Sequence, residues 1–457
     1  MESELTLSTA MRLSDRARLA LVGSGGKTSA LFQIAREMLA ASPAADGRVL
    51  LSASTHLATA QLALADRHYM IESLDQAPDR RADLPPGVLL FTGPETQGER
   101  TRGLEVDVLE RLRNLADFQG LPFLLEADGS RQRPLKAPAA HEPVIPAWAE
   151  TVGVVVGLSG LGKPLEEAWV HRPERFSALT GLPLGQEITV EAVRRLLLHP
   201  EGGLKGVPIE ARRVALLNQA DTPELQAAAG KLAADLIPDY QAAVIASLKP
   251  ADGGQPVVYA VHERVAGVLL AAGGSQRLGR PKQMLEWRGE PLVRHVARAT
   301  LSAGLSPLIV VTGGYRQQVE AALQDLPLTL VYNPNWQSGQ SASLQAGLRR
   351  LPPQTGGVIF LLSDQPQVPV PLLRSLVELH QRSLSPLVAP QAGGRRANPV
   401  LFDRVTFPDL FALRGDQGGR ALFTHYPAAW LPWHDPNLLL DIDTEEDYRR
   451  LLALEAP

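Results

Sequence analysis

Apolar runs and helical patterns alternate along the whole chain. Short apolar runs, such as residues 265–272 and 357–362, have the length and composition of buried strands. Between such runs apolar residues recur at helical spacing, as in residues 30–39, where they fall on one face. This alternation predicts α/β folds built on parallel sheets.

A polar, glycine-rich stretch interrupts the alternation at residues 249–255. The chain has 457 residues, which is more than one typical domain. A short apolar run follows the stretch, and a second series of strand and helix patterns begins at Val265. We therefore expect two α/β domains, residues 1–262 and residues 263–457.

Composition and charge exclude several classes of protein. The 45 basic and 49 acidic residues give a net charge of −4, and only 5% of residues are aromatic, so we expect no nucleic-acid partner. The chain has no cysteine, which excludes disulfides, thiolate metal sites and a cysteine nucleophile. The first residues lack a signal-peptide pattern, and no apolar run reaches the ~20 residues of a membrane span. We expect a cytoplasmic protein without a membrane partner.

The first glycine-rich loop, GSGGKT at residues 23–28, follows an apolar run at residues 18–22. A glycine loop between a strand and a helix start is suited to phosphate, because backbone N–H groups can approach its oxygens. Gly23, Gly26 and Lys27 would then contact an NTP, and the Thr28 hydroxyl would bind Mg²⁺. The spacing is shorter than that of a Walker A loop and similar to that of Mur ligases. An ordinary strand-to-helix turn is the alternative.

Acidic residues follow a predicted strand at residues 122–125. Carboxylates at the end of a parallel strand are suited to metal binding, and we expect Asp128 to be the metal ligand, with Glu126 as second choice. The alternative is a helix cap. The proline-rich segment that follows carries basic residues that either surround an anionic ligand or remain solvated: Arg131, Arg133, Lys136 and His141.

Two further features of the N-terminal half are less specific. Residues 218–221, NQAD, follow a strand pattern and are similar to the NKxD motif with which GTPases read guanine, but Gln219 replaces the lysine. A plain turn explains them equally well. His56 and His171 are isolated in the sequence, and an isolated histidine is usually structural.

Together, VGSGGKTS, Ser54-Thr55-His56, EADGSRQRPLKAP and HEPVIP resemble the YqeC family across residues 8–250. The resemblance implies a P-loop-like α/β domain with a nucleotide-dependent accessory role for selenium-dependent molybdenum hydroxylases. Its implied ligand is ATP or GTP, and its implied partner is a hydroxylase apoenzyme. The reaction of this domain and the involvement of selenium stay open.

The second glycine-rich loop follows the apolar run 265–272 and carries two cations, Arg277 and Lys282. Its glycines let the backbone approach phosphates, and the cations can neutralise charge that builds up during nucleotidyl transfer. Its spacing is neither that of a dinucleotide fingerprint nor that of a Walker A loop.

Polar residues follow the later strand patterns of the C-terminal half. Asp364 comes directly after residues 357–362, at the functional edge of the predicted sheet. We expect residues 438–440 to form a strand that places Asp441 and Asp443 on one side, followed by a helix capped by Thr444. The turn at residues 339–344 either reads a base and ribose or caps a helix through Ser341 or Ser343.

The sequence VLLAAGGSQRLGRPKQ fills the LAAGxSxRxGxxK signature and resembles the MobA/MocA-like nucleotidyltransferases from residue 265 to the end. The resemblance implies a Rossmann-like nucleotidyltransferase domain with a mostly parallel sheet. It implies catalytic roles for Arg277, Lys282 and Asp364, and Mg²⁺ binding by Asp364 and Asp443. The implied nucleotide contacts are Ala271, Ala272, Gly273, Gly274, Ser275, Gln340, Ser341, Ser343, Asn398 and Asp416.

This family implies transfer of CMP from CTP to molybdopterin, giving molybdopterin cytosine dinucleotide and pyrophosphate. Guanylyltransferase members tend to read LAGG and cytidylyltransferase members LAAG, as residues 270–273 do, and a methyl at Ala272 would favour the smaller base. Arg395, Arg396 and Arg420 suit an anionic acceptor. The alternatives are GTP as donor, another phosphorylated acceptor, or a chaperone that binds the cofactor and inserts it into an apoenzyme.

Overall fold

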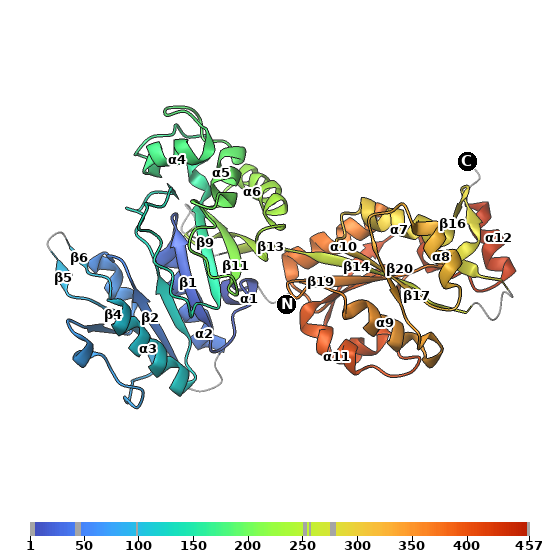
Figure 1. The fold of residues 1–457 in the computed structure, drawn as a ribbon, viewed down its shortest axis with the longest axis horizontal. Coiled ribbons are helices and arrows are strands. Elements are labelled where there is room, and N and C mark those ends of the chain that lie inside the picture. Colours follow the sequence, from blue (N-terminus) through green and yellow to red (C-terminus); the bar gives the residue numbers. More distant parts are fainter. Residues whose placement is uncertain are drawn as a thin grey trace. The chain divides into compact units, whose positions relative to one another are not determined.

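The computed structural model describes residues 5–41, 47–96, 99–249, 254–255, 257–274 and 280–454. Two compact units make up the chain, Met1–His262 and Glu263–Pro457, named here the N-terminal and the C-terminal unit. Each unit has its own sheet with helices against it, as Figure 1 shows. Across the described ranges, no helix has both the length and the apolar character needed to cross a membrane.

The N-terminal unit is built on a nine-stranded sheet of order β13-β12-β11-β9-β1-β7-β2-β4-β3. Its strands are β1 (Arg18–Gly23), β2 (Arg48–Ala53), β3 (Arg67–Met70), β4 (Gly87–Thr92), β7 (Phe123–Glu126), β9 (Thr151–Gly157), β11 (Arg212–Asn218), β12 (Ala242–Ser247) and β13 (Val257–Glu263). The pairings from β12 to β3 are parallel, as predicted. The carboxyl ends of these strands therefore share one edge of the sheet.

Helices and short strands complete this unit. The helices are α1 (Leu7–Ala10), α2 (Lys27–Ala41), α3 (Val106–Gln119), α4 (Pro173–Thr180), α5 (Val190–Leu198) and α6 (Pro223–Leu236). Two-residue strands form two small sheets, β5 (Glu95–Thr96) with β6 (Arg100–Thr101) and β8 (Leu135–Lys136) with β10 (Val170–His171). The β8–β10 pair joins the proline-rich segment to the chain just before α4, so residues far apart in sequence meet beside the sheet.

The C-terminal unit is built on an eight-stranded sheet of order β18-β17-β14-β19-β22-β20-β21, with β23 paired to β20. Its strands are β14 (Val265–Ala271), β17 (Leu308–Thr312), β18 (Thr329–Tyr332), β19 (Gly357–Leu362), β20 (Leu387–Ala392), β21 (Arg395–Arg396), β22 (Val400–Asp403) and β23 (Ala428–Trp433). Strands β18, β17, β14 and β19 run parallel to one another, and β22 runs antiparallel to β19 and β20. The sheet is thus mostly parallel, as predicted.

Helices cover both faces of this sheet, which explains why its central strands β14, β17 and β19 are continuous apolar runs. The helices are α7 (Leu292–Ser302), α8 (Arg316–Leu323), α9 (Gln340–Leu348), α10 (Val370–Ser383), α11 (Phe407–Ala412) and α12 (Glu445–Ala453). Alternate residues of β14 enter different cores: Leu269 packs with residues of α7, α8 and α10, and Val268 with residues of α9 and α11. Figure 1 shows α7 and α10 on one side of the sheet and α9 and α11 on the other.

One local prediction for the C-terminal half is wrong, and one of its stated alternatives is not observed. Residues 438–440 were expected as a strand, but Pro436–Leu439 is a 3-10 turn, because the Asp435 carboxylate accepts the Asn437 N–H and starts a turn there. The hydroxyls of residues 341 and 343 do not cap α9. Gly339 holds the cap position with a φ of 109°, which favours glycine. Thr444 does cap α12, as predicted.

A close approach of helix and strand positions α9. A Cβ atom added at Gly347 would lie 2.4 Å from Val268 Cγ1 in β14, so the helix approaches the strand where Gly347 has no side chain. At Gly230 in α6, by contrast, an added Cβ would meet nothing within 4 Å. The two glycines therefore play different roles within their helices.

We expect Gly347→Ala to destabilise the C-terminal unit by about 1–3 kcal/mol, because the new methyl overpacks the core. We expect Gly230→Ala to stabilise the N-terminal unit by about 0.5–1 kcal/mol, since alanine favours the helix and the space is open. Calorimetric unfolding of both variants is the measurement. Equal effects of the two substitutions would contradict the packing described for α9.

Candidate functional sites

The first glycine loop connects β1 directly to α2, and its shape requires glycine. Gly23, Gly25 and Gly26 have φ angles of 92°, 88° and 123°, which other residues rarely adopt. A Cβ at Gly25 would lie 2.3 Å from the Gly157 nitrogen. Because a helix start leaves backbone N–H groups without partners inside the helix, the loop and the first turn of α2, named here the phosphate cradle, suit phosphate oxygens.

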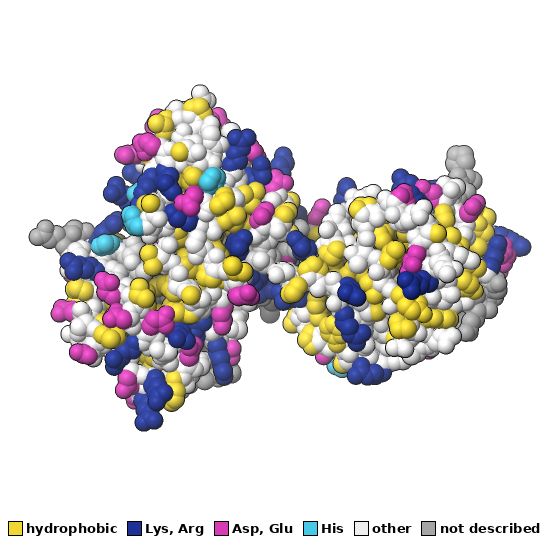
Figure 2. Space-filling view, in the orientation of Figure 1, with side chains coloured by type: hydrophobic (Ala, Val, Ile, Leu, Met, Phe, Trp, Pro, Cys, Tyr) yellow, Lys and Arg dark blue, Asp and Glu magenta, His cyan; other side chains and the backbone are white. Residues whose placement is uncertain are grey.

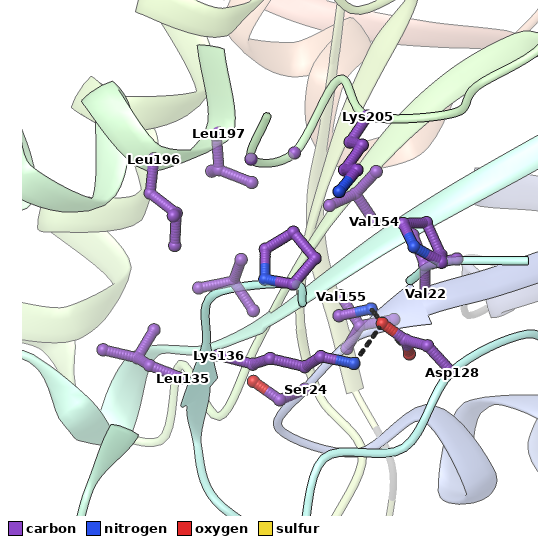
Figure 3. Close-up of a pocket in the computed structure, with 16 residues that line it drawn as sticks. Val22, Ser24, Asp128, Leu135, Lys136, Val154, Val155, Leu196, Leu197 and Lys205 are labelled. Carbon is purple, nitrogen blue, oxygen red and sulfur yellow. Dashed lines mark hydrogen bonds and ion pairs between the residues drawn. The ribbon is translucent and has the colours of Figure 1, made fainter. Parts of the chain in front are cut away.

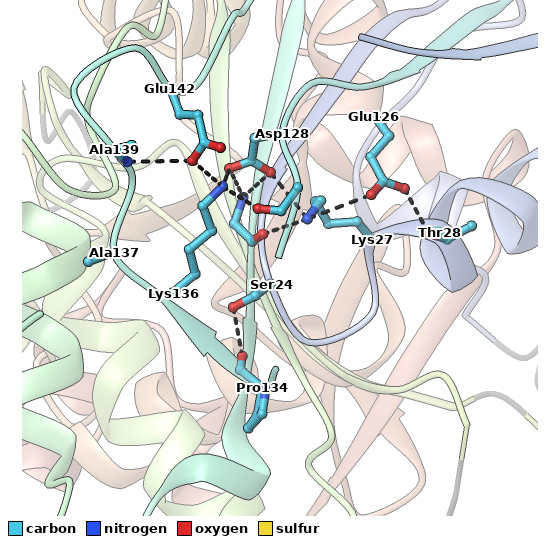
Figure 4. A network of polar contacts seen from close by, with 12 residues as sticks. Ser24, Lys27, Thr28, Glu126, Asp128, Pro134, Lys136, Ala137, Ala139 and Glu142 are labelled. Carbon is cyan, nitrogen blue, oxygen red and sulfur yellow. Dashed lines mark hydrogen bonds and ion pairs between the residues drawn. The ribbon is translucent and has the colours of Figure 1, made fainter. Parts of the chain in front are cut away.

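A network of charged side chains fills the space beneath this loop, as Figure 4 shows. The buried Lys27 ammonium donates to the Gly23 carbonyl at 2.6 Å and pairs with Asp128 at 3.1 Å. Asp128 also accepts from the Gly23 N–H at 3.1 Å and from Lys136 at 2.6 Å. Lys136 reaches Glu142 at 2.8 Å. Asp128, the expected metal ligand, is thus bound by two lysines.

Thr28 lies beside the other carboxylate of this strand end. Its hydroxyl donates to Glu126 at 2.7 Å, and Glu126 is 3.7 Å from the Lys27 ammonium. Burial raises the pKa of Glu126 above its ordinary value, although Lys27 and Thr28 oppose the shift. A hydroxyl and a carboxylate in contact beside a phosphate cradle are the pair that commonly holds the magnesium of a bound NTP. The geometry therefore favours Glu126, the second choice, as partner of Thr28.

A polar pocket of about 760 Å³ adjoins Thr28 and Glu126. Its basic residues come from four separate segments: His56, Arg100, Arg131, His171 and Arg172. Glu126 and Glu142 also line it, and Glu142 pairs with Arg172 at 2.9 Å. Burial and the charges of Arg172, Lys136 and Arg131 lower the pKa of His171 to about 4, so its imidazole is neutral at neutral pH. Figure 2 shows Lys and Arg side chains together with histidines on this unit. Three arginines suit an anionic group beside the phosphate cradle.

A second pocket touches the same network and differs in character (Figure 3). Its apolar wall is formed by Leu135, Leu196 and Leu197, and its charge comes from the Asp128–Lys136 pair. Of the basic residues named in the sequence, Arg131 and Lys136 are therefore part of the site. Arg133 and His141 line neither of these two pockets.

In the C-terminal unit, the lysine after the second glycine loop lies between two carboxylates. The Lys282 ammonium hydrogen-bonds to Asp364, at the end of β19, and to Asp443 at 3.2 Å. Burial opposes the charge on Lys282, but Asp364 and Asp443 outweigh it and raise its pKa. The Ile442 N–H donates to the Asp364 carbonyl at 3.3 Å, which holds the loop of Asp443 against the strand end. Ser275 and Arg277 lie outside the described residues.

Asp441 has a different environment from Asp443. It accepts a hydrogen bond from Gln365, and burial raises its pKa, with Asp364 and Asp443 adding to the shift. Asp443 instead faces Lys282, so the structure brings together Lys282, Asp364 and Asp443.

The beginning of the second glycine loop is packed from both sides. Gln283 donates to the Gly273 carbonyl at 2.7 Å, and the Gly314 N–H donates to the Ala272 carbonyl at 3.1 Å. Ala272 is only 5% exposed, and a Cβ added at Gly313 would lie 2.8 Å from its methyl. Trp336 covers Gly274, where an added Cβ would lie 2.8 Å from the ring. The sequence patterns assigned no role to Gln283 or Trp336.

A pocket of about 900 Å³ brings together three of the expected contact residues, Gln340, Asn398 and Asp416. Arg396 and Arg420 also line it, and the Arg396 guanidinium lies 4.5 Å from the centre of the Phe423 ring. Burial and the charge of Arg420 lower the pKa of Arg396. Two arginines that line one pocket suit an anionic ligand.

Ser341 and Ser343 are placed differently from Gln340. Ser341 lines a separate pocket with Asn333 and Arg414, and its N–H donates to the Gly415 carbonyl at 3.1 Å. The Ser343 hydroxyl accepts a hydrogen bond from Asn333 at 3.0 Å. Neither serine lines the pocket of Arg396.

Glu142 gives the N-terminal site a pH-dependent stability. Burial opposes its ionisation, but hydrogen bonds from Arg172 and Lys136 outweigh burial and lower its pKa from 4.5 to about 2. A carboxylate with a lowered pKa stabilises the fold fully above pH 4.5, and this contribution is lost as the pH falls through about 2.

We therefore expect Glu142→Gln to be less stable than the parent chain at pH 7, by about 1–2 kcal/mol after allowance for solvent screening. The difference should shrink as the pH falls from 4.5 toward 2. Urea unfolding across this range is the measurement, with the exposed Glu167→Gln as the control for loss of a surface charge. A difference that stays constant with pH would contradict the assigned ion pairs.

Two family profiles match this chain. The profile of the YqeC protein matches residues 19–174, and that of the MobA-like NTP transferase domain matches residues 267–430. Together they cover the two glycine loops and the carboxylates that lie beside them, except Asp443.

Individual relatives agree with these matches. The chain is 34% identical to uncharacterized protein YqeC of Escherichia coli, over 44% of this chain and 75% of that protein. It is 33% identical to nicotine blue oxidoreductase of Paenarthrobacter nicotinovorans, over 41% of this chain and 96% of that protein. It is 30% identical to molybdenum cofactor guanylyltransferase of Serratia proteamaculans, over 31% of this chain and 68% of that protein.

Among solved structures, Rv0371c from Mycobacterium tuberculosis is similar at 32% identity, covering 42% of this chain and 98% of that chain, with a TM-score of 0.38. The chain belongs to the YqeC family through its N-terminal unit and to the MobA-like NTP transferases through its C-terminal unit.

Proposed function

We propose that the C-terminal unit transfers CMP from CTP to molybdenum-bearing molybdopterin, giving molybdopterin cytosine dinucleotide and pyrophosphate. The N-terminal unit binds an NTP and acts as an accessory module in the maturation of a molybdenum hydroxylase. Nucleotidyl transfer is the activity of the family to which the C-terminal unit belongs.

The observation that carries the proposal is the position of Lys282 between Asp364 and Asp443. The three side chains come from the segment after β14, the end of β19 and the segment before α12. They meet at the carboxyl ends of parallel strands, where open α/β sheets bind their ligands.

The two carboxylates fit a divalent cation, because both already converge on one positive charge, the Lys282 ammonium. Among the residues that the structure describes, no three His, Cys, Asp or Glu side chains form a metal cluster. Magnesium suits such a site, since it is commonly held by one or two carboxylates together with water and phosphate oxygens. Asp364 and Asp443 would hold the ion, which supplies charge stabilisation to the departing pyrophosphate.

The reaction requires positioning and charge rather than a covalent intermediate. A phosphate oxygen of the acceptor attacks the α-phosphorus of the NTP in line. The bond from that phosphorus to the bridging oxygen of the β-phosphate breaks, and pyrophosphate leaves with the electron pair. Lys282 neutralises charge on the triphosphate, a role that Arg277 shares in the proposal.

The pocket of Arg396 and Arg420 suits the acceptor. Two guanidinium groups bind a phosphate well, and the Phe423 ring, over which the Arg396 guanidinium lies, adds an aromatic wall to the pocket. The similarity to a molybdenum cofactor guanylyltransferase supports an acceptor of this chemistry.

The choice of CTP rests on residues 270–273, LAAG. The Ala272 methyl is buried against Gly313, so its effect on the base acts through the backbone of residues 312–314 rather than by direct contact. We expect this packing to leave less room for a purine than for a pyrimidine.

The direct test uses α-labelled CTP or α-labelled GTP with Mg²⁺ and molybdenum-loaded molybdopterin, with detection of label in the pterin product. We expect label from CTP, at least about tenfold above that from GTP, which is a difference of ~1.4 kcal/mol. Asp364→Asn should lower the rate by about 100-fold or more, since it removes a carboxylate from the cation site. Lys27→Ala should retain transfer.

Label from GTP alone would contradict the choice of CTP as donor but not the proposed nucleotidyl transfer. Absence of label from both nucleotides, with a folded protein, would contradict the proposed transfer and favour the cofactor-inserting chaperone. Loss of transfer in a folded Lys27→Ala variant would contradict the separation of the two units' chemistry.

Adjacent arginines provide a matched test of the acceptor pocket. Arg395 and Arg396 are both exposed, but only Arg396 lines the pocket. We expect Arg396→Ala to raise KM for the pterin acceptor about tenfold or more, because a charge-assisted hydrogen bond is lost, with a smaller change in kcat. Arg395→Ala should change KM less than about twofold. Equal effects of the two substitutions on this KM would contradict the assignment of the pocket to the acceptor.

A further inference from the structure

The N-terminal sheet places a second set of loops beside its glycine loop. The strands β1, β9, β11 and β12 are neighbours in that order and run parallel, so their carboxyl ends lie along one edge. The glycine loop follows β1, residues 219–221 follow β11, and residues 248–249 follow β12. Between β1 and β11, the strand β9 ends in Gly157, where an added Cβ would lie 2.3 Å from Gln219 Oε1.

Asn218 ties these loops together. It is buried, its side-chain amide donates to the Gly25 carbonyl at 2.7 Å, and its side-chain oxygen accepts the Leu248 N–H at 3.1 Å. An added Cβ at Gly26 would lie 2.4 Å from the same amide nitrogen. A single side chain thus fixes the loops after β11 and β12 at a set distance from the phosphate cradle.

Asp221 extends from the loop that Asn218 fixes. Its side chain is exposed, and Oδ1 accepts a hydrogen bond from the buried Ser247 hydroxyl at 2.5 Å. A carboxylate offers about four acceptor positions, and one hydroxyl uses one of them while fixing the orientation of the group. Asp221 is therefore an oriented acceptor, three residues from the side chain that contacts the phosphate loop.

An oriented carboxylate discriminates among nucleobases. Guanine presents two adjacent donors, N1–H and the exocyclic amine on C2, which one carboxylate can accept together. Adenine has an acceptor at N1 and no amine on C2, so the same carboxylate would face a lone pair. Sites built to accept a particular hydrogen-bond donor reject analogues that lack it.

We propose that the N-terminal unit binds a guanine nucleotide, with its phosphates on the glycine loop and its base read by Asp221. This inference rests on the proposed nucleotide-binding role of the unit and goes beyond it by naming the base. The lysine of the NKxD motif, in whose place this chain has Gln219, is not needed for the contact between Asp221 and the base. Gln219 instead accepts a hydrogen bond from Ser159 at 2.6 Å and packs over Gly157.

The first experiment titrates the full chain with fluorescent GDP and fluorescent ADP, in the presence of Mg²⁺ and saturating CTP to occupy the C-terminal unit. We expect GDP to bind at least about 100-fold more tightly than ADP, because two hydrogen bonds to a charged group distinguish the bases. Lys27→Ala should abolish this binding, which assigns it to the glycine loop.

Binding of ADP as tight as or tighter than that of GDP would contradict the guanine assignment but not the proposed nucleotide-binding role of the unit. Absence of binding by both nucleotides would overturn the role itself and the inference with it.

The second experiment changes the hydrogen-bond acceptor, the Asp221 carboxylate. Asp221→Asn replaces one acceptor by a donor, which matches xanthine, whose C2 carries an oxygen in place of the amine. We expect this variant to lose at least about 100-fold in affinity for GDP and to gain affinity for XDP. The matched control is Asp235→Asn, an exposed aspartate on α6, which should bind GDP as the parent does. GDP binding unchanged in Asp221→Asn would overturn the inference.

Discussion

Each unit depends on one ion-pair arrangement, in which the lysine of a glycine loop or of the segment after it is bound by a carboxylate that follows the neighbouring strand. In the N-terminal unit Lys27 pairs with Asp128 at 3.1 Å, and β7, which leads to that carboxylate, lies beside β1. In the C-terminal unit Lys282 pairs with Asp364 and Asp443, and β19, which leads to Asp364, lies beside β14. The parallel pairing of the two strands is what brings each lysine and its carboxylate to the same edge.

The same arrangement serves different purposes because burial differs. The side chains of Lys27 and Asp128 are 1% and 2% exposed, so a further buried base, Lys136, is needed to balance the carboxylates, and Glu142 and Arg172 extend the network. The side chains of Lys282 and Asp443 are 21% and 47% exposed, which leaves the proposed cation site of the C-terminal unit accessible to water and ligand. The buried network suits a fixed scaffold around a phosphate loop, and the open pair suits a site through which substrate and product pass.

Much of this could be predicted from the sequence, because the informative residues follow their strands directly. Apolar runs separated by helical patterns gave the fold class, and Lys282, Asp364 and Thr28 lie where the strand-and-loop pattern predicted. The contacts that sequence could not provide come from distant segments. Glu142 and Arg172 join the N-terminal site through the β8–β10 pairing, and Ser247 reaches Asp221 through a pairing of β11 with β12. The wrong strand at 438–440 reflects local turn chemistry at Asp435 and Pro436, which overrides an apolar run.

The central claim is that one chain holds two separate nucleotide sites, one in each unit. Native mass spectrometry of the full chain with Mg²⁺, GDP and a non-hydrolysable CTP analogue tests it directly. We expect a complex of one chain with one GDP and one CTP analogue, formed in full when both are saturating. A chain that binds only one nucleotide at saturation, with GDP and the CTP analogue displacing each other, would contradict the claim.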